Sequence, residues 1–139
     1  MEYQRLHSIS QLYKSTLLDN VLPFWMTHSP DKEFGGYFTC LDRDGSVFDT
    51  DKFLWLQGRE VWLFSMLYNQ VERKSEWLDM AMLGAQFLLA QGRADNGSWY
   101  FSLTREGRPL VQPYNIFSDC FATQAFGQLY KATGDGQHA

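Results

Sequence analysis

The sequence contains an internal repeat whose two copies lie 62 residues apart. Without a gap, "GGYFTCLDRDGSVFDTDKFLWLQGREVWLFSMLY" aligns with "GSWYFSLTREGRPLVQPYNIFSDCFATQAFGQLY", so that turn glycines and aromatic residues stay in step. Gly45 aligns with Gly107, and Trp55 aligns with Phe117. A repeat of this length indicates an array of similar units, each of which buries its apolar face against its neighbours.

Each copy has the same predicted order of elements. An amphipathic helix comes first, short strand-like stretches around a "RDG" or "REG" turn follow, and a second helix ends the copy. We expect the first helices at about 8–26 and 75–91, and the second helices at about 52–71 and 115–132.

The second helix of the first copy is apolar around its whole axis over 53–68, whereas 75–91 has one polar side. A helix that is apolar on every side is predicted to be buried on every side. We therefore place 52–71 and 115–132 in an inner layer, with 8–26 and 75–91 outside it.

Two such units leave large inner faces uncovered, and a curved array of helical hairpins either carries polar caps or closes into a ring. We read residues 1–139 as the N-terminal portion of one toroidal domain, with repeat one at about 8–71 and repeat two at about 75–132. A ring of six hairpins would need about 370 residues. The C-terminal two thirds of the domain are then expected to be absent from this chain.

Composition excludes several classes of function. The net charge is −4 and no block of like charge stands out, so neither nucleic acid nor an anionic membrane is an expected partner. The start "MEYQRLHSIS" has no apolar signal core, and two cysteines, Cys40 and Cys120, make no disulfide framework. We expect a cytoplasmic protein. No zinc-ligand spacing and no phosphate-binding glycine loop is present, so no metal is expected.

Arg59 stands out because it lies in the middle of the apolar inner helix, where a guanidinium needs partners. One interpretation is structural: Arg59 stacks on a tryptophan and pairs with Glu60, Asp119 or another acid. The other is functional: Arg59 lines a central cavity and faces a substrate oxygen. The position matching Arg59 in the second copy is Phe121, so the arginine is not part of the scaffold that the copies share.

Trp55 and Phe117 occupy equivalent positions at the starts of the two inner helices. They are candidates for stacking on a sugar ring, and core packing is the alternative.

Three stretches, "FTCLDRDG", "WLQGR" and "FSDCF", together resemble the N-acyl-D-glucosamine 2-epimerase family, also known as renin-binding proteins. The similarity covers about residues 20–135. It implies an all-α fold, an (α/α)6 barrel, of which this chain holds the first two helical hairpins with short β-hairpin insertions. It also implies interconversion of N-acetyl-D-glucosamine and N-acetyl-D-mannosamine by a cytosolic homodimer, with ATP as a stabiliser or activator rather than a reactant.

In this family two histidines exchange the C2 proton of the open-chain sugar, and the arginine of the "QGR" motif lies in the active site; here it is Arg59. The histidines of this chain, His7, His28 and His138, match neither catalytic histidine. We therefore expect no catalytic base in residues 1–139 and no turnover by this chain alone. Two alternatives remain open: a 2-epimerase or isomerase for another sugar, and a non-catalytic module that pairs with a full-length enzyme or binds renin.

Overall fold

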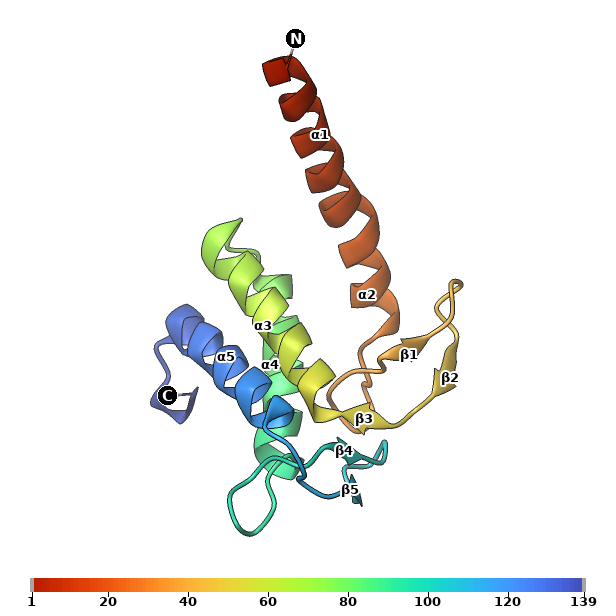
Figure 1. Cartoon of the computed structure of the whole chain (residues 1–139), viewed down its shortest axis with the longest axis vertical. Coiled ribbons are helices and arrows are strands. Elements are labelled where there is room, and N and C mark those ends of the chain that lie inside the picture. Colours follow the sequence, from red (N-terminus) through yellow and green to blue (C-terminus); the bar gives the residue numbers. More distant parts are fainter. Residues whose placement is uncertain (1, 139) are drawn as a thin grey trace.

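The computed structural model describes residues 2–138, and three of its helices form a compact group (Figure 1). Helix α3 (Leu54–Gln70) packs against both α4 (Ser75–Gln91) and α5 (Phe117–Thr133), while α4 and α5 touch only slightly. The equivalent second helices of the two copies, α3 and α5, thus lie side by side. The bounds of α4 agree with the predicted range 75–91, and those of α3 and α5 differ from prediction by one or two residues.

The N-terminal helix is longer than predicted and changes its geometry in the middle. It runs through α1 (Glu2–Thr16), the π-helical turn η1 (Leu17–Val21) and α2 (Leu22–His28). Pro23 has no N–H to donate, so the i→i−4 hydrogen bonds are interrupted just before it, where the Leu22 N–H bonds to the Leu17 carbonyl. Pro23 itself lies in the first turn of α2, where a missing N–H is tolerated.

Only the C-terminal part of this helix packs against the rest of the described chain. Leu22 belongs to the core, whereas α1 has no buried residue and projects away from the other helices (Figure 1). Its apolar side chains Tyr3, Leu6 and Tyr13 are exposed.

The strands show the 62-residue spacing in the backbone itself. Strands β1 (Cys40–Leu41) and β2 (Val47–Asp49) form one hairpin, and β4 (Ser102–Leu103) and β5 (Pro109–Val111) form the other, each strand 62 residues after its counterpart. Both turns contain a glycine at positive φ, Gly45 at 85° and Gly107 at 92°, a conformation that other residues rarely adopt.

A further strand, β3 (Lys52–Phe53), pairs with β4 and was not predicted. It extends the second hairpin into a three-stranded sheet in the order β3-β4-β5 and so joins the first copy to the second. Two residues directly before a helix are too few to show an alternating pattern.

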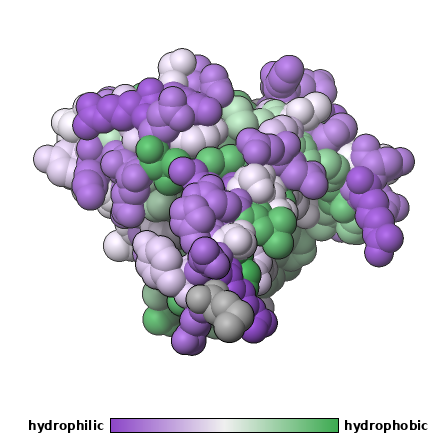
Figure 2. Space-filling model, turned by 90° about the horizontal axis from the view of Figure 1, so that it is seen from above, coloured by the Kyte–Doolittle hydropathy of each residue, from purple (hydrophilic) through white to green (hydrophobic). Residues whose placement is uncertain are grey.

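The apolar stretch 53–68 is not buried on every side in this structure, in keeping with the expectation that two units alone leave inner faces uncovered. Arg59 is exposed, and Trp55, Leu56, Trp62 and Leu63 are only half-buried. Within residues 2–138, α4 and α5 cover the side of α3 that carries Leu54, Gln57, Val61, Phe64 and Leu67, and much of the opposite side stays open. Apolar side chains accordingly reach the surface among polar ones (Figure 2). No helix in the described part of the chain has the length and apolar character that crossing a bilayer requires.

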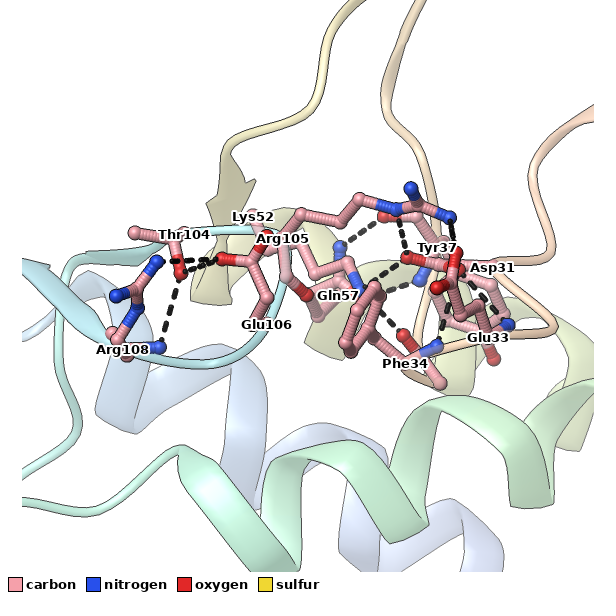
Figure 3. Close-up of polar contacts among 11 residues, drawn as sticks. Asp31, Glu33, Phe34, Tyr37, Lys52, Gln57, Thr104, Arg105, Glu106 and Arg108 are labelled. Atoms are coloured by element: carbon pink, nitrogen blue, oxygen red, sulfur yellow. Dashed lines mark hydrogen bonds and ion pairs between the residues drawn. The ribbon is translucent and has the colours of Figure 1, made fainter.

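A buried ion network ties the loops of both copies together (Figure 3). Asp31 and Lys52 are both fully buried, and the Lys52 Nζ donates to Asp31 Oδ2 at 2.9 Å and to the carbonyls of Gly35 and Arg105. Arg105 binds the same carboxylate with two N–H groups, at 3.0 and 3.1 Å. Burial raises the pKa of Asp31, but the hydrogen bonds from Arg105 and Lys52 outweigh it and lower this pKa to about 2.

The segment before the first hairpin is fixed to the helices by Tyr37 and Gln57 (Figure 3). The Gln57 side-chain amide pairs with both the N–H and the carbonyl of Tyr37, each at 2.8 Å. The Tyr37 hydroxyl donates to the Met80 carbonyl, and Gly84 leaves room for the ring, since a Cβ there would lie 2.3 Å from a Tyr37 ring carbon.

Replacing Asp31 should destabilise the chain strongly. Asp31→Asn removes the only carboxylate that Lys52 contacts in residues 2–138 and leaves a buried ammonium without a counter-charge. We expect a loss of about 3–5 kcal/mol in the free energy of unfolding, measured by urea denaturation with tryptophan fluorescence. Glu33→Gln removes an exposed partner of Arg105 and should cost less than about 1 kcal/mol. Equal small losses in both variants would contradict this role for Asp31.

Candidate active site

A pocket of about 440 Å³ lies between the starts of α3 and α5 and brings together all three predicted site residues. Its lining consists of Trp55, Arg59, Phe101, Tyr114, Asn115, Phe117 and Phe121. The wall is thus aromatic, with one guanidinium and one amide. What these residues bind stays a prediction.

The pocket forms because equivalent positions of the two copies face each other. Trp55 and Arg59 are one turn apart on α3, and their counterparts Phe117 and Phe121 are one turn apart on α5. The helices approach closely at Gly58, where a Cβ would lie 3.0 Å from the backbone carbonyl carbon of Phe121. A side chain at position 58 would therefore push the two helices apart.

The start of α5 is held by Asn115, whose Oδ1 accepts a hydrogen bond from the Phe117 N–H at 3.0 Å. This contact satisfies one of the N–H groups that a helix start leaves without a partner in the helix. It also keeps Asn115 and Phe117 together at the edge of the pocket.

Arg59 is stacked but not paired with an acid. Its guanidinium carbon lies 5.5 Å from the centroid of the Phe121 ring, and the Trp55 and Phe121 rings are 5.9 Å apart. Within residues 2–138 its side chain forms neither an ion pair nor a hydrogen bond, so neither Glu60 nor Asp119 is its partner. The structural interpretation predicted that Arg59 stacks on a tryptophan and pairs with an acid. In the structure Arg59 stacks on Phe121 instead and pairs with no acid in residues 2–138.

The sequence analysis missed Phe101 and Tyr114, which complete the wall of the pocket. Their rings pack against each other with centroids 4.8 Å apart, and Phe101 also packs on Phe53. Both break the repeat, because Phe101 aligns with Thr39 and Tyr114 with Lys52. The criterion that singled out Arg59 would therefore have found them too.

A second, largely apolar pocket of about 260 Å³ lies on the other side of Arg59, between α2 and α3. Glu60 lines it, and the Glu60 carboxyl accepts a hydrogen bond from the buried Ser29 hydroxyl. Burial raises the pKa of Glu60 to about 8, so this carboxyl is protonated at pH 7. A neutral Glu60 offers Arg59 no counter-charge.

None of the three histidines lines the pocket that holds Trp55, Arg59 and Phe117. His7 is exposed on α1, and His28 packs on Phe24 and over Gly45. His138, in the 3₁₀ turn η2 (Gly136–His138), is buried, with its Nδ1 3.1 Å from the Thr133 hydroxyl. In the described part of the chain, no group of three or more acidic, histidine or cysteine side chains is placed to hold a metal ion.

Comparison with known proteins gives consistent matches. Residues 36–139 match the family described as N-acylglucosamine 2-epimerase. The chain is 49% identical over 122 residues to the N-acylglucosamine 2-epimerase of Mus musculus, an alignment that covers 85% of this chain but only 29% of that protein. The human protein of the same name is 48% identical over 122 residues, with the same coverage.

Solved structures share the fold. A cellobiose 2-epimerase from Bacillus thermoamylovorans B4167 superimposes with a TM-score of 0.86 at 24% identity, over 95% of this chain and 34% of that one. A sugar epimerase from a ruminal bacterium gives a TM-score of 0.84 at 28% identity, over 94% of this chain and 33% of that one. The predicted fold class is thereby confirmed: the chain has the fold of part of an (α/α)6 barrel, and it spans about a third of these structures.

Glu60 should make stability depend on pH in a defined direction. Because its folded pKa is raised, the folded chain holds a proton that the unfolded chain has lost between about pH 4.5 and pH 8, and the free energy of unfolding falls as pH rises through this window. Glu60→Gln stays neutral, so its stability relative to the wild type should increase from pH 5 to pH 8 in urea denaturation. Glu72→Gln, which removes an exposed carboxylate, should show no such trend. A Glu60→Gln difference that does not vary with pH would contradict the assignment of a half-buried, neutral carboxyl to Glu60.

Proposed function

The chain belongs to the N-acylglucosamine 2-epimerase family, and from this premise we propose that it supplies the sugar-facing arginine of an enzyme that interconverts N-acetyl-D-glucosamine and N-acetyl-D-mannosamine. The observation that carries the proposal is the pocket in which Arg59 stands among aromatic rings with no acid partner in residues 2–138. Aromatic faces suit the apolar face of a sugar ring, and an unpaired guanidinium suits a developing oxyanion.

The chemistry of the reaction gives Arg59 its role. Inversion at C2 requires ring opening, removal of the C2 proton beside the C1 aldehyde, and return of a proton to the opposite face. The intermediate carries enolate charge on O1, and a fixed cation beside O1 stabilises that charge. We assign this position to Arg59, with Trp55 and Phe117 flanking the sugar.

Removing the C2 proton from one face and returning a proton to the other requires two acid–base groups with pKa values near neutral, one on each face of C2. His7, His28 and His138 lie outside the pocket, so we propose that both bases belong to the part of the longer protein that this chain does not include. The chain spans about 29% of the length of the mouse relative. On this proposal residues 1–139 alone do not catalyse the epimerisation.

Several finer points remain predictions. The fold does not fix the sugar, since the structural neighbours include cellobiose 2-epimerases. The exposed apolar side chains of α1 and the open side of α3 favour, as a second candidate, a module that associates with another protein such as renin or a full-length enzyme. The homodimer, ATP as stabiliser and the cytoplasmic location stay expectations from the family resemblance.

This chain alone should not exchange the C2 proton of its proposed substrate. We expect the C2 signal of N-acetyl-D-mannosamine to persist in heavy water over hours in an NMR assay, because no histidine lines the pocket. The mouse enzyme, assayed in parallel, should exchange it. Exchange by residues 1–139 would show that they contain an acid–base pair of their own.

Arg59 should be needed for turnover in a complete enzyme. We would replace the matching segment of the mouse epimerase with this chain and expect the chimera to epimerise N-acetyl-D-mannosamine. Arg59→Met should lower its kcat by about 10²–10³-fold, the usual effect of losing one oxyanion donor. Arg43→Met, in the exposed β1–β2 turn, serves as the matched control. A folded chimera without activity, or an Arg59→Met chimera within about threefold of its parent, would contradict the proposal.

A further inference from the structure

The Arg59 side chain has few contacts in the described part of the chain that could fix its orientation. In residues 2–138 its guanidinium has no hydrogen-bond or ion-pair partner, and the one aromatic ring within cation–π distance is that of Phe121, 5.5 Å away. An exposed arginine with several rotatable bonds otherwise samples many rotamers, and ordering it costs conformational entropy.

We propose that Phe121 is the positioning residue of Arg59: its ring face holds the guanidinium over the pocket and keeps the N–H donors available to the substrate. The assignment rests on the proposed role of Arg59. Phe121 itself touches no reacting atom in this scheme, so it acts through the arginine.

Phe121 is well placed for this role because its own position is fixed. It lies one turn after the start of α5, is half-buried, and has the Trp55 ring 5.9 Å from its own. The contact at Gly58 holds the Phe121 backbone against α3, one residue before Arg59 in sequence. The ring therefore reaches Arg59 from the neighbouring inner helix.

An aromatic face holds a guanidinium differently from a carboxylate. A carboxylate forms a bidentate pair that occupies two N–H donors and neutralises the charge, whereas a ring contacts the flat face and leaves the donors at the edge free. The acid next to Arg59 in sequence, Glu60, is bonded to Ser29 and its raised pKa keeps it neutral at pH 7. Neither Phe121 nor Glu60 therefore occupies the N–H donors of Arg59 that a substrate oxyanion would need.

The repeat gives an independent reason to regard the pair as a unit. Arg59 and Phe121 are the same position of the two copies, and α3 and α5 face each other at this level. The first copy carries the cation and the second copy carries the ring. A change at one position alone removes the interaction.

The test compares three variants of this chain. Phe121→Leu removes the ring face at similar volume, Phe121→Tyr keeps it, and Phe126→Leu makes the same substitution on the same helix outside the Arg59 pocket. The Nε–H signal of Arg59 is followed by ¹H–¹⁵N NMR and assigned by its loss in Arg59→Lys. Circular dichroism and urea denaturation confirm that each variant is folded.

We expect a ring-shielded Arg59 signal in the wild type, in Phe121→Tyr and in Phe126→Leu, and a shift toward the position of free arginine side chains in Phe121→Leu. An Arg59 signal that is the same in Phe121→Leu as in the wild type would overturn the proposal. If Phe121→Leu fails to fold, a Phe121→Met variant replaces it under the same criterion.

A second readout separates this inference from the proposed function. In the mouse chimera, Phe121→Leu should lower kcat about two- to fivefold, as expected for an exposed cation–π contact, with Phe121→Tyr close to its parent. An NMR shift with an inactive chimera would leave the positioning role intact and contradict the epimerase proposal. An active chimera with unchanged kcat and KM in Phe121→Leu would contradict the positioning role.

Discussion

The ammonium group of Lys52 sets the architecture around the pocket, because a fully buried charge must be surrounded by compensating groups. Asp31 and the carbonyl of Gly35, both in the loop between α2 and β1, and the carbonyl of Arg105, in the β4–β5 turn, converge on it from two loops. Lys52 is in β3, which pairs with β4 and ends one residue before α3 begins. The same contacts that satisfy this lysine therefore fix where α3 starts and where the second hairpin lies relative to it.

The pocket follows from that arrangement. Its first wall is the opening two turns of α3 and its second wall is the opening two turns of α5, while Phe101 and Tyr114 come from the segments on either side of the β4–β5 hairpin. Since Arg105 in that hairpin shares the Asp31 carboxylate with Lys52, the loop that carries Phe101 is anchored to the first copy. The aromatic wall and Arg59 thus belong to one connected unit.

The repeat predicted the helices and the hairpins well because their signals are local: apolar periodicity for α3, α4 and α5, and turn glycines for Gly45 and Gly107. It could not predict the ion network, because residues 31, 52 and 105 are far apart and no local pattern links them. The alignment even conceals the network, since Arg105 aligns with Arg43, an exposed arginine outside it. What covers the open side of α3 could not be predicted for a related reason: the apolarity of a face indicates that it favours burial, not which element buries it.

For the site, the most useful signal was a departure from the repeat. Copies that share a scaffold keep glycines and core residues in step, so a position where one copy has arginine and the other phenylalanine is free of the shared packing role. The structure adds what no alignment of the copies contains, namely that these two positions face each other across the inner helices. An arginine that serves only to join two helices would be paired with an acid and shielded. Arg59 is exposed in a pocket, stacked on a ring and bonded to no acid in residues 2–138, which is the state that the proposed contact with a substrate oxygen requires.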